Sequence, residues 1–126
     1  MAACDILLHW LLEPDALALY RMIIADAARH PGLAQTVDGP FQQASEAVAA
    51  ILAVNDDRTA ETIRLGADMF VRLVAGEALD RAAQGIEPAG ITNHTRERSH
   101  AAVEFFVAGW SKWRTLADDL TPAKRV

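Results

Sequence analysis

The sequence predicts an all-α domain of about five helices, and three observations support this fold class. Alanine is the commonest residue, with leucine, glutamate and arginine in support, and these residues favour helix over strand. Apolar residues recur three or four positions apart, and no stretch alternates as a strand would. Most of the five prolines and seven glycines fall between the periodic stretches. At 126 residues the chain fits one domain, which we expect to span residues 1–120 with a frayed tail at 121–126.

The first two helices are expected on either side of a proline. Residues 4–12 are apolar nearly all round and stop before Pro14, so this helix is either deeply buried or the end of a longer one. The second helix follows Pro14, with Asp15 as its expected cap, and runs to about Arg29. We expect it to end at His30, because the residue before a proline leaves the helical region.

The third and fourth helices are bounded by proline, glycine and polar turns. The third is expected to begin at Pro40, where proline is tolerated in the first helical position. It closes at residues 55–57, an Asn-Asp-Asp turn. The fourth is the longest, from residue 59 to about 84, and Gly85 is placed to end it in the left-handed conformation.

The last two helices predict a homodimer. The fifth helix is expected from residue 92 or 93 to about 118, and both it and the fourth carry apolar residues on more than one side. Small residues along them would let a second pair of helices approach closely. A two-fold four-helix bundle with a second copy of the chain is the simplest way to bury this surplus. The expected interface residues are Ala67, Val71, Val74, Ala102, Phe105, Gly109 and Trp113.

Charge and composition argue against several classes of function. The net charge of −5 repels a phosphate backbone, so we do not expect this chain alone to bind DNA. The single cysteine, Cys4, excludes an internal disulfide and suits a reducing compartment. No apolar run reaches the length of a membrane span, and the first residues lack the pattern of a signal peptide. The expected location is the cytoplasm.

Motifs that carry catalysis do not occur in the sequence. There is no glycine-rich phosphate loop, no nucleophile elbow and no pair of cysteines at metal-binding spacing. Glu97 and His100 have the spacing of ligands in carboxylate-bridged metal sites, but a second such pair is missing. We therefore interpret them as neighbours on an exposed helical turn. We expect no enzyme activity, no catalytic residues, no cofactor and no bound metal.

One block of residues has a distinctive order. Residues 18–34 read ALYRMIIADAARHPGLA, with an aromatic-arginine pair, an apolar triplet, an acidic-alanine pair and a His-Pro turn followed by leucine. A Gly-Pro pair at 39–40, LVAGE at 73–77 and VEFFVAGW at 103–110 follow. In this order the residues resemble the regulatory domain of TetR/AcrR-family transcriptional repressors, over about residues 5–115.

The resemblance implies the C-terminal half of a repressor, which senses an effector and dimerises through its last two helices. It does not extend to the N-terminal helix-turn-helix domain with which that family reads DNA. The sequence is either a trimmed C-terminal piece or a natural protein without that domain. A first helix that looks cut short favours trimming.

The resemblance also implies a pocket among the first four helices for a small apolar or amphipathic effector. Aromatic and methionine side chains could line it, and ordinary core packing is the alternative for each of them. A helical adaptor that dimerises without any ligand is the alternative function, and its core would be packed solid. The expected ligand-binding residues are Trp10, Tyr20, Met69, Phe70, Phe106 and Trp110.

Overall fold

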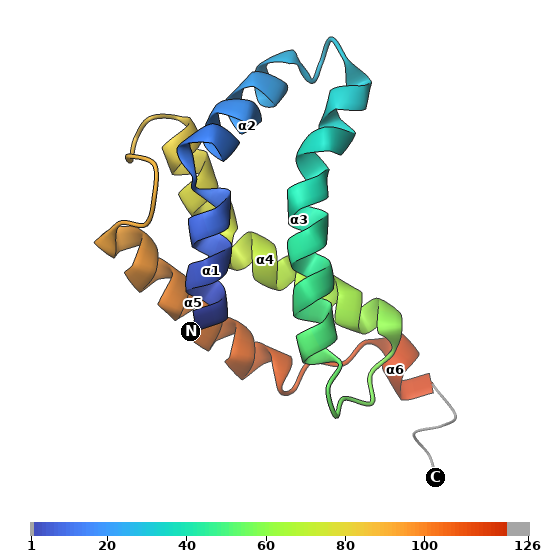
Figure 1. Ribbon diagram of the computed structural model, residues 1–126. Helices are drawn as coiled ribbons and strands as arrows, with labels where there is room; N and C mark the ends of the chain where they lie inside the picture. Colours follow the sequence, from blue (N-terminus) through green and yellow to red (C-terminus); the bar gives the residue numbers. More distant parts are fainter. Residues whose placement is uncertain (1, 121–126) are drawn as a thin grey trace.

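The computed structural model of the protein describes residues 2–120 (Figure 1). Throughout this part of the chain the regular structure is helical, so the all-α fold class expected from the sequence is confirmed. The expected frayed tail at 121–126 lies outside the described residues. The helices are α1 (Ala2–Leu11), α2 (Pro14–Asp26), α3 (Pro31–Leu52), α4 (Ala60–Ala83), α5 (Asn93–Trp110) and α6 (Leu116–Leu120).

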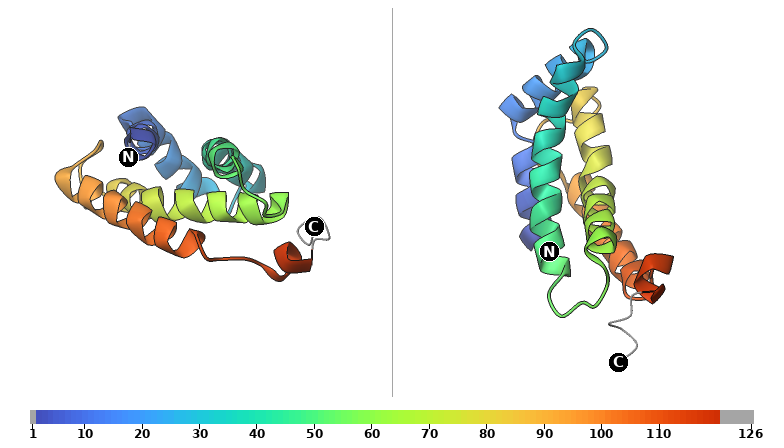
Figure 2. Two further views of the ribbon diagram at one scale, coloured as in Figure 1. Left: turned by 90° about the horizontal axis from the view of Figure 1, so that it is seen from below. Right: turned by 90° about the vertical axis from the view of Figure 1, so that its right-hand side faces the viewer.

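The helices form two layers, and α4 contacts most of the other helices. Helices α1, α2 and α3 make one layer, and α4 and α5 make the other (Figure 2). Helix α4 contacts α1, α2, α3 and α5, which makes it the central element of the domain. Burial of apolar side chains where the two layers meet is the main favourable contribution to folding. The core includes Leu8, Leu12, Leu17, Phe41, Val71, Val74, Leu79 and Ala102.

Helix α4 starts and stops where the local sequence predicts. The Thr59 hydroxyl accepts a hydrogen bond from the backbone N–H of Thr62 and so caps the first turn. At the other end Gly85 has a φ of 74°, the left-handed conformation that costs glycine little. The N–H of Ile86 donates to the carbonyl of Arg81 at 2.9 Å, which completes a Schellman motif.

The boundaries around α2 and α3 differ from the expected ones. Helix α3 begins at Pro31, not at Pro40, so the expected loop between them is helical. A proline in the first turn lacks only an N–H that has no helical partner there, and the break at His30 therefore suffices to separate the two helices. The capping role expected for Asp15 is also wrong. Glu13 occupies the cap position without a side-chain hydrogen bond, and Asp15 already lies in the first turn of α2.

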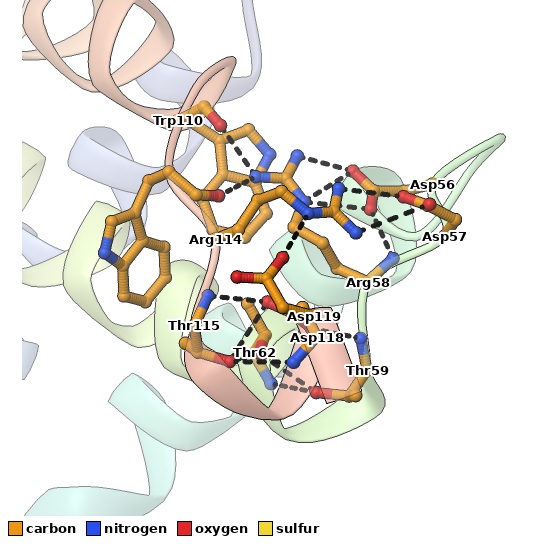
Figure 3. Close-up of polar contacts among 11 residues, drawn as sticks. Asp56, Asp57, Arg58, Thr59, Thr62, Trp110, Arg114, Thr115, Asp118 and Asp119 are labelled. Carbon is orange, nitrogen blue, oxygen red and sulfur yellow. Dashed lines mark hydrogen bonds and ion pairs between the residues drawn. The ribbon is translucent and has the colours of Figure 1, made fainter. Parts of the chain in front are cut away.

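The fifth expected helix is interrupted before residue 118. Helix α5 ends at Trp110 and α6 begins at Leu116. The guanidinium of Arg58 donates to the carbonyl oxygens of Trp110 and Trp113, at 2.6 and 2.9 Å, and so satisfies backbone groups that the end of the helix leaves free (Figure 3). Thr115 and Asp118 then exchange hydrogen bonds between side chain and backbone and start the short α6.

Candidate effector groove and dimer face

A wide apolar groove runs between α1 and α3, and we call it the α1–α3 groove. Its volume is about 860 Å³. Phe70 of α4 and Ile91 of the loop before α5 contribute to its lining, and several large apolar side chains remain open to it. Ile6 is 70% exposed, Trp10 44% and Ile51 63%. The lining residues are Asp5, Ile6, Leu7, His9, Trp10, Glu13, Gln43, Ala44, Ala47, Val48, Ile51, Phe70 and Ile91.

A second apolar surface lies on the two helices of the other layer, and we call it the α4–α5 face. It holds a shallow groove of about 660 Å³. Exposed side chains at positions 65, 69 and 73 are spaced four apart, so they share one side of α4, and Phe105 of α5 is 76% exposed. The residues lining the groove are Gly66, Asp68, Met69, Arg72, Leu73, Phe105, Phe106, Gly109, Trp110 and Trp113.

Four aromatic rings connect the two surfaces. The ring of Phe70 meets that of Phe106 edge-on, with centroids 5.0 Å apart. Phe106 stacks on Trp110 at 5.6 Å, and Trp110 lies 5.8 Å from Trp113. Offset and edge-on contacts of this kind add to the stabilisation that comes from buried area. Because Phe70 also lines the α1–α3 groove, the row of rings reaches from that groove to the α4–α5 face.

Arg58 and Gly66 hold Trp110 in this position. The guanidinium of Arg58 lies over the indole ring, 3.6 Å from its centroid, and binds the carboxylate of Asp56 through two nitrogens. These hydrogen bonds from Arg58 outweigh partial burial and hold the pKa of Asp56 below its ordinary value. On the other side, Gly66 leaves room for the ring, because an added Cβ would lie within about 3.0 Å of three of its atoms.

Asp118 joins the start of α4 to the segment between α5 and α6 (Figure 3). Its fully buried carboxylate accepts hydrogen bonds from the backbone N–H groups of Thr59 and Thr115, at 2.7 and 2.9 Å. Burial raises the pKa of Asp118, but these bonds and those from the hydroxyls of Thr62 and Thr115 outweigh it. The pKa of this carboxyl group therefore lies well below its ordinary value of 3.8.

The six residues expected to bind an effector do not surround one space. Trp10 and Phe70 line the α1–α3 groove, whereas the other aromatic and methionine residues, Met69, Phe106 and Trp110, line the α4–α5 face. Tyr20 lines neither surface. Its hydroxyl donates to Asp80 at 3.4 Å, and burial together with that carboxylate raises the pKa of Tyr20.

The residues expected at a dimer interface divide in the same way. Phe105, Gly109 and Trp113 lie on the α4–α5 face. The other four, Ala67, Val71, Val74 and Ala102, are buried inside the protomer, so their side chains are not open to a second copy. The same helices are involved, but the exposed stripe is the one that contains Leu65, Met69 and Leu73.

The sequence interpretation missed most residues of the α1–α3 groove. The lining residues on α1 other than Trp10, those on α3, and Ile91 in the loop before α5 were not singled out as ligand-binding residues. The available signal was a first helix that is apolar nearly all round, together with small and apolar residues in the second half of α3. The missed residues with apolar side chains are Ile6, Leu7, Ala44, Ala47, Val48, Ile51 and Ile91.

Reactive and metal-binding groups do not gather at either surface. Within residues 2–120, no three histidine, cysteine, aspartate or glutamate side chains lie together as a possible metal site. Cys4 is buried, and burial raises the pKa of its thiol. A third groove, of about 680 Å³ between α3 and α4, is lined by mixed polar and charged side chains such as Glu46, Arg64 and Asp68. Among the helices described, none is long and apolar enough to cross a bilayer.

The sequence matches one known protein family over most of its length. Residues 1–112 match the family described as AefR-like transcriptional repressor, C-terminal domain. The chain belongs to this family, and it is therefore a C-terminal regulatory domain of the TetR type. Domains of this class typically dimerise and bind small effectors, and they are generally not enzymes. Comparisons with curated proteins and with solved structures gave no match.

Proposed function

We propose that this chain binds a small apolar or amphipathic effector in the α1–α3 groove and forms a homodimer through the α4–α5 face. In this proposal it acts in the cytoplasm as the sensing half of a transcriptional repressor. DNA would be read by a helix-turn-helix domain and not by the residues of this chain. The observation that carries the proposal is the gathering of exposed large apolar side chains on two separate surfaces of a domain of this family.

The α1–α3 groove suits a small ligand. Its volume of about 860 Å³ falls in the range of small-molecule sites, and its walls are mainly apolar with a few polar groups at the edge. Soluble monomers rarely expose a large contiguous apolar surface, and such a surface often marks a binding site. A ligand lying against Trp10 and Ile51 would cover apolar surface that is otherwise hydrated.

The α4–α5 face suits a second copy of the chain. Phe105 is 76% exposed, and Met69 and Leu73 beside it are 49% and 41% exposed. Gly109 has nothing within 4 Å of the position of a Cβ, so backbones can approach closely there. Two copies that pair these helices about a two-fold axis would bury the same residues from each side in a four-helix bundle.

Phe70 offers a physical route between the two surfaces. Its ring lines the groove and contacts Phe106, which lines the α4–α5 face. A ligand that binds one position of Phe70 better than another would shift the population of arrangements of α4 and α5. In the assembled repressor such a shift would change the spacing of the DNA-reading domains.

A pair of tryptophan variants on α3 tests the groove. Ala47 lines the groove and Ala50, three residues further on, does not, although both are exposed. We expect apolar and amphipathic compounds that bind to raise the melting temperature of the unmodified chain and of Ala50→Trp. The corresponding gain in the free energy of unfolding is about 2.7 kcal/mol when the ligand is present at a hundredfold excess over its Kd. In Ala47→Trp the added ring fills the groove, and the shift should be lost.

Differential scanning fluorimetry over a panel of alkanols, fatty acids, alkylamines and aromatic compounds gives the measurement. A panel in which no compound stabilises the unmodified chain contradicts the effector proposal and favours an adaptor that dimerises without a ligand. A full shift retained in Ala47→Trp would place the ligand elsewhere.

A further inference from the structure

Two carboxylates lie among the residues that line the α1–α3 groove. Asp5, His9 and Glu13 all line it, the first two on α1 and Glu13 just after that helix. Among the described residues that line it there is no lysine or arginine. An anionic ligand would therefore meet two carboxylates and no lysine or arginine, in a chain whose net charge is already −5.

Neither carboxylate is fully satisfied by the protein. Oδ1 of Asp5 is buried without a hydrogen-bond partner, and it lies 4.0 Å from Nε2 of His100, which is also buried without a hydrogen bond. The Asp5 side chain as a whole remains 40% exposed. Glu13 is exposed, and as the residue before α2 it makes no side-chain capping bond.

Trp10 adds a third feature that favours a cation. It lines the same groove, and 44% of it is exposed. The face of an indole ring attracts ammonium groups through its quadrupole, most of all where water is partly excluded. Apolar walls, two carboxylates and an open indole ring together favour a ligand with an apolar body and a positive charge.

We propose that the effector of the α1–α3 groove is a cationic amphiphile, an amine or quaternary ammonium compound with an apolar chain or ring system. This proposal rests on the proposed function, because it names the chemical class of ligand for the same groove. The apolar part lies against Ile6, Val48 and Ile51, and the positive group lies at the edge beside Asp5 and Glu13.

Three probes that share one alkyl chain test the charge preference. Decyltrimethylammonium, decanol and decyl sulfate are titrated below their aggregation limits into the unmodified chain by isothermal titration calorimetry. We expect the ammonium probe to bind at least about fivefold more tightly than decanol, from two partly solvated charge contacts. The sulfate probe should bind most weakly. Equal affinity for the ammonium probe and decanol overturns the proposal.

Matched charge variants locate the preference. In Asp5→Asn/Glu13→Gln the advantage of the ammonium probe over decanol should disappear, while decanol binds as before. The control Glu61→Gln/Glu104→Gln changes the net charge equally at two exposed residues that do not line the groove, and it should keep the advantage. A preference that survives in the groove variant overturns the cationic class but leaves the effector groove intact. Failure of all three probes to bind the unmodified chain counts against both proposals.

Discussion

A few polar residues position the apolar surfaces of this domain. Arg58 is 9% exposed, and it joins Asp56 to the carbonyl oxygens of Trp110 and Trp113. Removing one partner of such a buried ionic group is costly, because it leaves the other partner without compensation. Arg58 thereby fixes both the end of α5 and the indole ring on the α4–α5 face. None of this was visible in the sequence, because Arg58 and Trp110 lie 52 positions apart.

Asp118 makes stability depend on pH in a defined direction. Its pKa is lower in the folded chain than the ordinary value of 3.8, so below about pH 4 the unfolded chain binds the extra proton more readily. The contribution of Asp118 is therefore present above that value and is lost as the pH falls. We expect Asp118→Asn to be less stable than the unmodified chain at neutral pH, with a difference that shrinks in acid.

Urea unfolding of both proteins across the acidic range measures this difference. Asp119→Asn is the control, because the Asp119 side chain is 62% exposed and its ion pair with Arg114 lies at the surface. A difference between Asp118→Asn and the unmodified chain that stays constant into acid would contradict the assigned role of Asp118.

At the scale of the elements, the sequence predicted what local chemistry decides. The stop at Gly85 depends on residues within a few positions and occurs as expected. The caps at Thr59 and Thr92 are equally local, although the sequence interpretation placed only the helix starts there. The expected start of α3 was wrong because Pro31 and Pro40 both fit a first helical position. Pro31, the earlier of the two, was interpreted as part of a loop. The end of α5 depends on Arg58, which no local pattern indicates.

Two glycines of α4 make a matched test of its packing against α5. An alanine at position 66 would overlap the ring of Trp110, which Arg58 and Phe106 hold in place. An alanine at position 76 would meet nothing within 4 Å. Overpacking costs about 1–3 kcal/mol, whereas a helical glycine replaced by alanine without strain gains about 0.4–1 kcal/mol.

We therefore expect Gly66→Ala to lower the free energy of unfolding by about 1–2 kcal/mol, and Gly76→Ala to raise it. Chemical denaturation followed by circular dichroism provides both values. Two variants that shift stability by the same amount in the same direction would show that Trp110 does not pack against Gly66 as described.

At the scale of the whole molecule, periodicity indicated which helices carry surplus apolar surface but not which side the chain itself covers. Ala67 and Val71 were expected to face a second copy. Because α4 lies at the centre of the fold, both side chains are instead buried in the core of the same protomer. Trp10 and Trp110 were expected to share one pocket, and instead they lie on different surfaces. The angles at which helices cross decide such assignments, and those angles depend on contacts distant in sequence.

The proposed dimer depends on one exposed face, and a single charge there is expected to disrupt it. Phe105→Glu places a carboxylate at a residue that is 76% exposed in the protomer. The change should leave folding intact and prevent association, because the carboxylate would be buried unpaired between two copies. Ile86→Glu is the matched control, since Ile86 is 56% exposed in the loop after α4, away from the face.

Sedimentation velocity at micromolar concentration tests the central claim, that the exposed α4–α5 face pairs two copies of this regulatory domain. We expect the unmodified chain and Ile86→Glu to sediment with twice the chain mass of 13.7 kDa, and Phe105→Glu to sediment with that mass alone. An unmodified chain that remains a monomer, or a Phe105→Glu variant that remains a dimer, would contradict it.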